Sequence, residues 1–432
     1  MRVLGVVVEY NPFHNGHLYH LTLAKELVKP EYVVAIMSGS FCQRGEPAII
    51  SKFSRTEIAL LNGIDVVFEL PFVYAVQDAG GFAKGAVWSL HHTGVVTDIV
   101  FGSESADLDF LQKIARVMVE QPEPFPTMMK EELKKGHSFP NARKYALMRY
   151  FEVTKEMDPR EVLKIEKSND ILGVEYLRSL IELNSPIKPH VVKRVGAEDR
   201  DERFQGKFSS ATAIRKCILK GDWEKVAKAV PVNSLQIMSR ELSEGRGPVS
   251  LQDMEQLILS KLRLMDRFQL QRLHGFSEGI DKRFVECAAK VSSLEEFFSC
   301  VKSRRFTLSK IRRLSLYALF EVDSQLVERS NTFGPQYLRV LGFNSKGREL
   351  LSKMKRVSTL PIISLCSLYK KVLEQSLKKP ERFKIDAKLF EQQLLYDIRA
   401  TSIHSLMFPK RSERTGDMDF KLPPIVITEE VC

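Results

Sequence analysis

The feature that most constrains this chain is the regular alternation of apolar and amphipathic segments over its first hundred residues. The apolar runs cover 3–8, 32–37, 65–70 and 98–101, and the helical patterns that follow them cover 18–28, 51–62 and 79–92. Uninterrupted apolar runs are typical of parallel strands that are buried on both faces. Short links between such strands and helices indicate right-handed βαβ units. We therefore predict a Rossmann-like α/β fold with a parallel sheet, in which ligands bind beyond the carboxyl ends of the strands.

Strands become rare after residue 107, and the pattern divides the chain into three parts. Residues 1–220 are expected to form the α/β domain, with a helical insertion at about 107–185 and a late strand near 190–195. Residues 221–408 have helical periodicity almost throughout. Residues 409–432 are polar and then rich in proline, which predicts an extended C-terminal tail.

The charge of the chain is unevenly distributed. It has 65 Lys and Arg against 54 Asp and Glu, a net charge of +11. Residues 1–216 hold 28 of each sign, so the whole excess lies in residues 217–432, with 37 cations against 26 acids. A neutral half joined to a basic half favours a chain in which one half performs chemistry and the other binds a polyanion. Solvated helix faces are the alternative explanation of the basic half.

Composition excludes several other classes of protein. No apolar run approaches the roughly 18–20 residues that cross a bilayer, so we expect no membrane partner. The first apolar run ends at Glu9 with no small-residue cleavage site, which argues against a signal peptide. Six cysteines, at positions 42, 217, 287, 300, 366 and 432, form no CxxC pair. Their spacing indicates neither a zinc site nor a disulfide framework, and we expect a reducing cytoplasm.

The loop after the first strand carries the pattern His14-x-Gly16-His17, which opens the first helix. Unpaired N–H groups and the helix dipole make a helix start a site for anions. Two imidazoles beside it can donate hydrogen bonds to phosphate oxygens, and Gly16 lets the backbone approach a nucleotide closely. Two surface histidines at a helix start are the alternative.

A second helix start, at residues 207–216, carries three hydroxyls between flanking cations. Ser209 and Ser210 are suited to cap this helix. The same hydroxyls, with Thr212, can hold a departing pyrophosphate, and Arg215 adds a positive charge. Capping alone is the simpler interpretation when this segment is considered by itself.

The densest basic segment, residues 302–313, contains six cations and no acid. These are Lys302, Arg304, Arg305, Lys310, Arg312 and Arg313. Cations arranged over helices suit a nucleic-acid phosphate backbone. Phe306 lies between them, and core packing is its simpler role. A second basic segment covers residues 346–356. Lys52 and Arg55 are further candidates for phosphate or RNA contacts, or they only decorate a helix start.

Together these motifs resemble the HxGH nucleotidyltransferase superfamily, which includes the class I aminoacyl-tRNA synthetases. His14-x-Gly16-His17 matches its first signature, and Ser209-Ser210-x-Thr212-x-Ile214-Arg215 resembles its second, SSTxIR-type signature with Ala211 inserted. Further similarity lies in residues 7–20, 51–55, 101–104, 167–172 and 304–313. Over nearly the full chain, these stretches resemble the bacterial tRNA(Met) cytidine acetate ligases.

The resemblance implies a HUP-type nucleotidyltransferase domain and a reaction in two steps. Acetate attacks the α-phosphorus of ATP and expels pyrophosphate, which gives acetyl-adenylate. The N4 amine of the wobble cytidine of elongator tRNA(Met) then takes the acetyl group, which leaves AMP and N4-acetylcytidine. Mg²⁺ is the expected companion of ATP, although no carboxylate cage is visible in the sequence.

The resemblance also implies contacts with ATP. These would come from Val7, Val8, Glu9, Tyr10, Asn11, Pro12, Phe13, His14, Asn15, Gly16, His17, Leu18, Tyr19, His20, Gly102, Asn169 and Arg194. The motifs themselves supply the other candidates: His14, His17 and Arg215 for catalysis, and Ser209 and Ser210 for the phosphates. The basic segment supplies the candidates for tRNA contacts, which are Arg304, Arg305, Lys310, Arg312 and Arg313. Without the resemblance, Asn169 is simply a helix cap and Arg194 an exposed ion pair.

Two other functions remain open at this stage. One is a metabolite adenylyltransferase, whose product keeps AMP; the long basic region argues against it. The other is a catalytically silent RNA-binding protein, against which the intact His14, Gly16, His17 and Arg215 argue. The sequence does not choose between acetate and other small acids, and it leaves the tRNA species and the oligomeric state undetermined.

Overall fold

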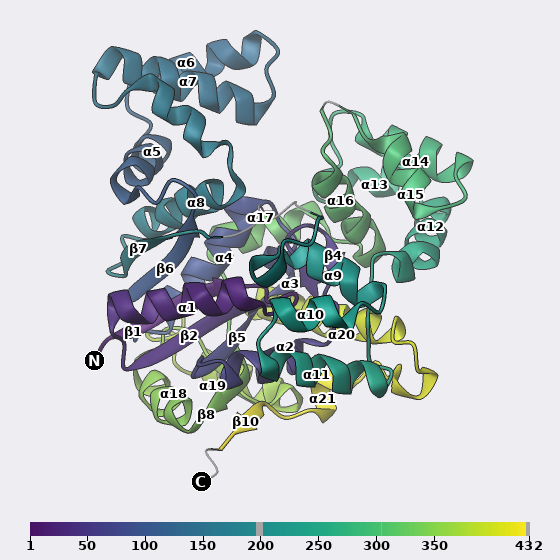
Figure 1. Cartoon of the computed structure of the whole chain (residues 1–432). Coiled ribbons are helices and arrows are strands. Elements are labelled where there is room, and N and C mark those ends of the chain that lie inside the picture. Colours follow the sequence, from purple (N-terminus) through teal and green to yellow (C-terminus); the bar gives the residue numbers. More distant parts are fainter. Residues whose placement is uncertain (196–201, 304, 429–432) are drawn as a thin grey trace.

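The computed structural model describes residues 1–195, 202–303 and 305–428 (Figure 1). Its centre is a sheet with the strand order β10-β8-β5-β2-β1-β6-β7, and β9 pairs with β8 beside this path. The strands are β1 (Val3–Val8), β2 (Tyr32–Ser38), β5 (Val66–Leu70), β6 (Asp98–Ser103), β7 (Lys188–Lys193), β8 (Leu338–Asn344), β9 (Ile362–Ile363) and β10 (Ile425–Ile427). All neighbouring pairs are parallel except β5 with β8. The predicted Rossmann-like parallel sheet is confirmed.

Each face of the sheet carries its own hydrophobic core, because side chains alternate along a strand. In β2, Val34 and Ile36 belong to one core, while Val33, Ala35 and Met37 belong to the other. The second core includes helices α1 (Asn15–Val28), α2 (Lys52–Leu61), α9 (Ala211–Leu219), α10 (Trp223–Ala229) and α11 (Val232–Ser243). The first core includes α4 (Ala79–His92), α8 (Ser168–Glu182), α17 (Ser324–Phe333), α18 (Ser345–Val357) and α20 (Ala387–Leu406). Both faces are therefore covered, as apolar parallel strands require.

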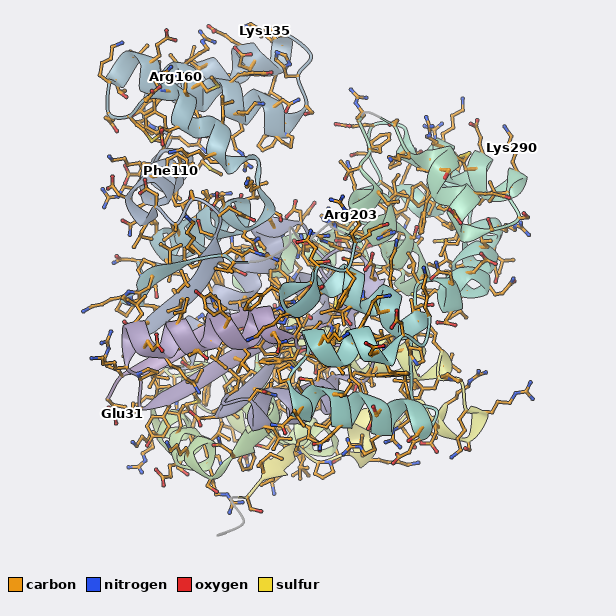
Figure 2. The ribbon with its side chains drawn as sticks, viewed as in Figure 1. Glu31, Phe110, Lys135, Arg160, Arg203 and Lys290 are labelled. Carbon is orange, nitrogen blue, oxygen red and sulfur yellow. A yellow bond between two sulfur atoms is a disulfide. The ribbon has the colours of Figure 1, made fainter. Side chains whose placement is uncertain are left out.

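Two helical arms project from this sheet on the same side in Figure 1. The first arm contains α5 (Leu108–Glu120), α6 (Phe125–Lys134) and α7 (Phe139–Thr154). The second contains α12 (Glu255–Leu264), α13 (Arg267–Gln271), α14 (Ile280–Lys290), α15 (Leu294–Val301) and α16 (Leu308–Phe320). Figure 2 labels Lys135 and Arg160 at the far end of the first arm and Lys290 at that of the second. The remaining named helices are α3 (Phe72–Ala75), α19 (Tyr369–Leu377) and α21 (Met418–Lys421).

The C-terminal half differs from the sequence prediction in two ways. Residues 221–408 are not wholly helical, because β8 lies in the sheet beside β5. Residues 409–428 are not simply extended, because they contain α21 and then β10, which pairs with β8. The division of the chain at residues 220 and 408 stays a prediction, although the sheet draws strands from both sides of it. In the described part of the chain, no helix is both long and apolar enough to span a membrane.

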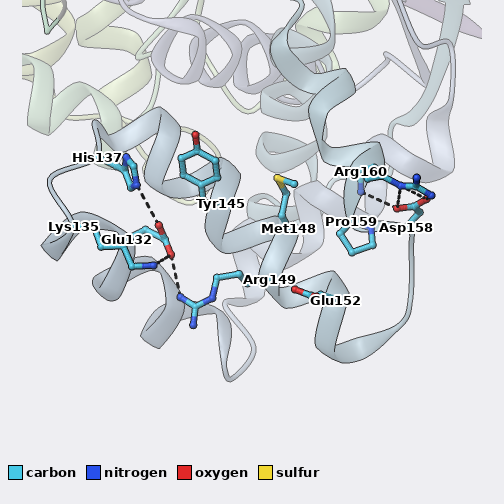
Figure 3. A pocket seen from close by; sticks show the side chains of 10 residues that line it. All are labelled: Glu132, Lys135, His137, Tyr145, Met148, Arg149, Glu152, Asp158, Pro159 and Arg160. Atoms are coloured by element: carbon cyan, nitrogen blue, oxygen red, sulfur yellow. Dashed lines mark hydrogen bonds and ion pairs between the residues drawn. The ribbon is translucent and has the colours of Figure 1, made fainter.

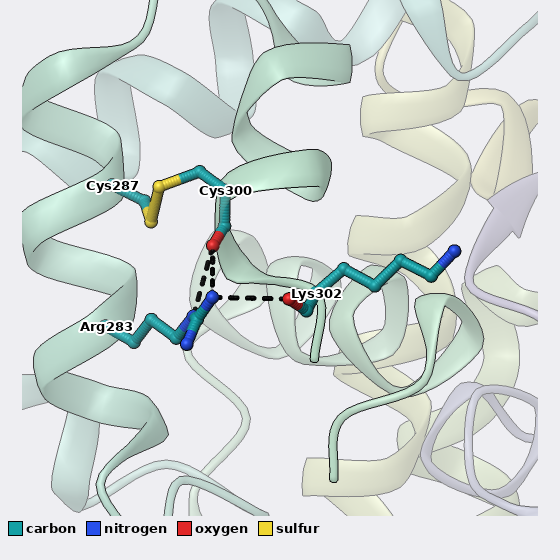
Figure 4. The surroundings of a disulfide bond; sticks show 4 residues. All are labelled: Arg283, Cys287, Cys300 and Lys302. Carbon is teal, nitrogen blue, oxygen red and sulfur yellow. Dashed lines mark hydrogen bonds between the residues drawn. A yellow bond between two sulfur atoms is a disulfide. The ribbon is translucent and has the colours of Figure 1, made fainter. Parts of the chain in front are cut away.

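The expectation that the cysteines form no disulfide is wrong. Cys287 in α14 and Cys300, in the last turn of α15, are joined by a disulfide, with their Cα atoms 5.9 Å apart (Figure 4). Arg283 donates hydrogen bonds to the carbonyls of Cys300 and Lys302. Side-chain to backbone hydrogen bonds therefore hold the same region together beside the disulfide. The spacing of these cysteines in the sequence does not predict the disulfide. They are 13 residues apart and are brought together by the packing of two helices.

Four charged side chains, buried together, join the N-terminal and C-terminal parts of the sheet. Lys52 Nζ lies 2.8 Å from Glu69 Oε1 and 2.9 Å from Asp419 Oδ1. Arg339 in β8 pairs with the same two carboxylates, at 3.0 and 2.6 Å. All four side chains are at most 5% exposed. Although burial favours the neutral acid, Arg339 and Lys52 hold the pKa of Asp419 below its usual value.

Replacing Lys52 by Met should destabilise the protein by about 3–5 kcal/mol, because two buried carboxylates would be left with one cation. Lys113→Met is a matched control, since Lys113 pairs with Asp109 at an exposed helix surface and should cost less than about 1 kcal/mol. Chemical denaturation measures both free energies of unfolding. Equal losses in the two variants would contradict the structural role of the buried cluster.

Candidate active site

The first loop is fixed by its own buried side chains. Phe13 is fully buried and packs edge-on against Tyr10, with ring centroids 4.6 Å apart. Asn11 Oδ1 accepts a hydrogen bond of 2.8 Å from the backbone of Ile49. Arg55 donates to the carbonyls of Glu9, Ser38 and Gly39. The loop between β1 and α1 therefore has a defined course before any ligand binds.

His14 and His17 form a capping box at the start of α1. His14 Nδ1 accepts from the backbone of Gly16 at 3.0 Å, and His17 Nδ1 accepts from the backbone of His14 at 3.3 Å. The two rings stack with centroids 3.7 Å apart. Burial, together with His14, Arg194 and His20, holds the pKa of His17 well below its usual value, so this ring is neutral at pH 7.

These bonds determine which nitrogen of His17 carries the proton. A neutral imidazole that accepts at Nδ1 bears its hydrogen on Nε2. His17 is thus prepared to donate from Nε2 to an anion without bringing a positive charge of its own. His14 also accepts at Nδ1, so the same tautomer follows for its neutral form. The pair is suited to donate hydrogen bonds to phosphate oxygens, and this role stays a prediction.

The second predicted motif lies against the first loop. Asn15 Nδ2 donates to the carbonyls of Lys207 and Lys228, at 3.3 and 3.1 Å. Arg215 Nη1 donates to the carbonyl of Asn11 at 2.8 Å. Ser210 caps α9 through the backbone of Ala213. Two motifs separated by about two hundred residues therefore form one site.

The hydroxyls of this motif already have intramolecular partners. Ser209 Oγ accepts from the backbone of Gln205 and donates to the carbonyl of Gly206, both at 2.8 Å. The capping role of Ser210 is confirmed by its bond to Ala213. A role of either hydroxyl toward pyrophosphate stays a prediction.

The other three predicted nucleotide contacts lie along β6, β7 and α8. Gly102 is in β6, where a Cβ atom would lie 3.8 Å from His20 Cδ2. The backbone N–H of Arg194, just after β7, donates to the carbonyl of Ser103 at 2.9 Å. Burial and the charge of Arg194 lower the pKa of His20 to about 4. These contacts place Gly102 and Arg194 beside α1, next to the histidine motif.

Asn169 is oriented by the carboxylate of Glu104, which lies in the similar stretch 101–104 but is given no role from the sequence. Its Nδ2 donates to Glu104 Oε1 at 2.6 Å, and Glu104 Oε2 accepts from the backbone of Asp170 at 3.0 Å. Asp170 in turn accepts from the backbone of Glu104 and Ser105. With its amide nitrogen held by Glu104, Asn169 keeps its carbonyl oxygen as an acceptor for a ligand.

A short hairpin of β3 (Phe41–Cys42) and β4 (Glu46–Pro47) borders the first loop. The backbone N–H of Gln43 donates to Glu9 Oε1 at 2.6 Å. Glu46 Oε2 lies 3.0 Å from Arg215 Nη2. Sequence patterns do not reveal Glu46, because its partner is 169 residues away and no spacing rule connects them.

Several predicted phosphate or RNA ligands are engaged inside the protein. Lys52 belongs to the buried charge cluster, and Arg55 is fully buried beneath the first loop, so neither is a surface ligand. Arg312 pairs with Glu46, and Arg313 Nη1 donates to the carbonyl of Gln43 at 3.4 Å. These two arginines are therefore not simply solvent-facing, because α16 packs against the hairpin.

The other members of the basic segment are more open. Arg305 is 67% exposed and lies 3.6 Å from Glu278. Lys310 Nζ lies over the ring of Phe306, 5.1 Å from its centroid, and Phe306 itself is buried in the core. Arg304 lies outside the described residues. The assignment of these cations to tRNA stays a prediction.

A cavity of about 700 Å³ in the first arm is not part of this site (Figure 3). Its lining comes from α6, α7 and the turn around Asp158, and includes no residue of the two motifs. Glu132 faces Lys135, His137 and Arg149, and Asp158 pairs with Arg160. Most of the charged side chains that line this cavity are thus paired with each other.

Comparison with known proteins agrees with this geometry. The model of the HIGH Nucleotidyl Transferase family matches residues 1–419. A tRNA(Met) cytidine acetate ligase of Thermotoga maritima is 55% identical over 424 residues, which cover 98% of this chain and all of that protein. One of Thermosipho africanus is 52% identical over 428 residues, covering 99% of this chain and all of that protein.

Solved structures give the same result. A crystal structure of apo Thermotoga maritima TmcAL superimposes with a TM-score of 0.97 at 56% identity, over 99% of this chain and all of that one. A second, bound with alpha-thio ATP, gives a TM-score of 0.95 at 55% identity with the same coverage. Similarity that extends over both whole chains includes the histidine motif, both arms and the C-terminal strands. This chain therefore belongs to the HIGH nucleotidyltransferase family, in the branch of the tRNA(Met) cytidine acetate ligases.

Proposed function

We propose that this protein is an ATP-dependent ligase that converts acetate to acetyl-adenylate and acetylates N4 of the wobble cytidine of elongator tRNA(Met). The observation that carries the proposal is the stacked pair of His14 and His17 at the start of α1, with His17 neutral, and its link to Arg215 through the carbonyl of Asn11 in the same loop. The names of the relatives and the alpha-thio ATP in one related structure support it. Because the substrate is a tRNA, we place the enzyme in the cytoplasm.

The chemistry requires an activated carboxylate. Acetate and an aromatic amine do not condense in water, and adenylation supplies AMP as a leaving group. Negative charge builds on the α-phosphate oxygens while acetate adds and pyrophosphate departs. Hydrogen-bond donors that are already oriented stabilise this charged transition state more than they stabilise the ground state. We assign that task to Nε2 of His14 and His17. No side chain needs to become a covalent nucleophile.

Arg215 is suited to the departing pyrophosphate. It is anchored by the carbonyl of Asn11 and by Glu46, and its side chain is 19% exposed. An arginine that is already oriented loses little freedom when it binds phosphate in a bidentate manner. We infer that Arg215 contacts the β- and γ-phosphates and stays with them as pyrophosphate departs. Gly102, Asn169 and Arg194 contact the adenosine portion.

The residues present fit a Mg²⁺ ion only as a companion of ATP. Within the described ranges, no group of three His, Cys, Asp or Glu side chains has metal-binding geometry. Glu9 and Glu46, the acids beside the first loop, are occupied by Gln43 and Arg215. Mg²⁺ bound to ATP is commonly held by phosphates and water, where it neutralises charge. We assign it no protein ligand.

The second half supplies the surface for tRNA in this proposal. In the basic segment Arg305 is exposed and Lys310 is half-buried over Phe306, and phosphate contacts from such groups position a nucleic acid without reading its sequence. The wobble base must leave the anticodon loop to reach the adenylate, as bases do in other base-modifying enzymes. Acetate as the acid, and the elongator tRNA(Met) as the acceptor, are the specific parts of this proposal.

The first test follows the fate of two labels in one reaction. With labelled acetate, labelled ATP and tRNA(Met), the acetate label should end on the tRNA and the adenylate label in free AMP. Replacing acetate by formate, propionate or butyrate tests the choice of acid. A stable product that retains AMP covalently would instead identify a metabolite adenylyltransferase, and no turnover of ATP would identify a silent RNA-binding protein.

His17→Ala should reduce the rate of acetyl-adenylate formation by about 10²–10³, because the charged transition state then has one oriented donor fewer. ATP–pyrophosphate exchange in the presence of acetate measures this rate. His137→Ala is the matched control, since His137 lies in the first arm beside Glu132, and it should exchange at the wild-type rate. Circular dichroism should show the same fold in both variants. Wild-type exchange in His17→Ala would remove this residue from the adenylation step.

Replacing Arg305 and Lys310 together by Gln should weaken tRNA binding and flatten its salt dependence, because each cation that binds a phosphate releases counterions. The slope of log K against log salt should become shallower by about 0.7 for each phosphate of a single-stranded loop that the variant no longer neutralises. Acetyl-adenylate formation should continue, since the partners of these two side chains, Glu278 and Phe306, belong to the second arm. An unchanged salt slope would move the tRNA surface to another basic segment, with residues 346–356 the next candidate.

A further inference from the structure

The hairpin of β3 and β4 joins the first loop to the second arm. On one side, Gln43 donates to Glu9 just after β1. On the other side, the turn packs directly on the backbone of α16, because a Cβ atom at Gly45 would lie 2.6 Å from the backbone nitrogen of Arg313. Gly45 also has a φ of +76°, which favours glycine. The turn therefore tolerates no side chain between the two halves of the protein.

Glu46 is the chemical link across this contact. One carboxylate oxygen, Oε2, lies 3.0 Å from Nη2 of Arg215, and the other, Oε1, accepts from Nη1 of Arg312. Arg215 also donates to the carbonyl of Asn11 in the first loop. A continuous line of polar contacts thus runs from the histidine motif to α16. The three side chains are between 18% and 24% exposed, so solvent screens them only in part.

The single carboxylate of Glu46 competes with other anions for its two arginines. If ATP phosphates draw Arg215 away, Glu46 depends on Arg312 for compensation. If a tRNA phosphate draws Arg312 away, Glu46 depends on Arg215. Without both cations, a largely buried carboxylate would have no counter-charge, which is costly. The pairing of Arg312 in this structure is incomplete, because its buried Nε has no hydrogen-bond partner among the described residues.

We propose that Glu46 is a positioning residue that couples the nucleotide site to the tRNA surface by holding Arg215 and Arg312 on its two oxygens. The inference rests on the proposed function, in which Arg215 contacts the phosphates of ATP and the second half of the chain holds tRNA, and it adds that Arg312 meets RNA when Glu46 releases it. The coupling is antagonistic while the triphosphate is bound, and it relaxes when pyrophosphate leaves and Arg215 returns to Glu46. Release of Arg312 toward tRNA is then favoured after acetyl-adenylate has formed.

The test measures tRNA affinity in two nucleotide states of the full-length protein. The dissociation constant of tRNA(Met) is determined with saturating α,β-methylene-ATP and with saturating AMP, and their ratio is the coupling factor. We expect tRNA to bind about fivefold or more weakly with the triphosphate analogue, within the range usual for coupled sites. Glu46→Gln should reduce the factor to about one. Arg312→Gln should do the same without altering the carboxylate.

Glu278→Gln is the matched control. Glu278 pairs with Arg305 in the same arm and is 53% exposed, so it stands outside the line of contacts through Glu46, and its coupling factor should equal that of the wild type. A merely structural Glu46 would lower both affinities and leave their ratio unchanged, which overturns the inference. A wild-type factor of one also overturns it. Failure of the proposed function is separate, since it would appear as a wild-type protein that forms no acetyl-adenylate.

Discussion

The buried pairing of Lys52 and Arg339 with Glu69 and Asp419 is the interaction on which the architecture depends. It joins α2 and β5 of the N-terminal α/β unit to β8 and α21 from the far end of the chain. Each charge is acceptable inside the protein only because the others are present. The site of the first loop is therefore supported by residues from both ends of the sequence. Lys52 begins the helix that also carries Arg55, which fixes the ends of β1 and β2.

The parts that sequence could predict are those decided locally. The apolar runs at β1, β2, β5 and β6 have no polar alternative, so their burial on both faces follows directly. His14 and His17 could be recognised because their pattern lies at a helix start that directly follows a buried strand. By contrast, β8 and β10 escaped prediction because they are short segments within or after helical sequence, stabilised by the sheet edge and by Asp419. Sequence alone suggests surface roles for Lys52 and Arg55. The partners that explain their burial, Glu69 for Lys52 and backbone carbonyls for Arg55, are brought close only by the fold.

Site residues that act through other residues are the hardest to find from sequence. The sequence assigns no role to Glu104, although it lies in the stretch 101–104, or to Glu46, yet one orients Asn169 and the other holds Arg215. Their partners lie 65 and 169 residues away, so only the fold brings them together. The disulfide of Cys287 and Cys300 belongs to the same group, because helix packing rather than spacing makes it possible. The residues expected to touch a ligand have recognisable signatures, while the residues that position them do not.

The charge state of the first loop explains why a histidine pair suits this chemistry. An imidazolium would attract ATP strongly already in the ground state, and binding that is equal in both states does not accelerate the chemical step. Burial next to Arg194 instead keeps His17 neutral, and its Nδ1 is committed to the backbone of His14. In the proposed mechanism only the hydrogen bond from Nε2 acts on the phosphate, and its value grows as charge builds there. Arg194 and Arg215, at the edges of the site, carry the positive charge. Glu46 partly neutralises the charge of Arg215. The site thus separates attraction of the nucleotide from stabilisation of the transition state.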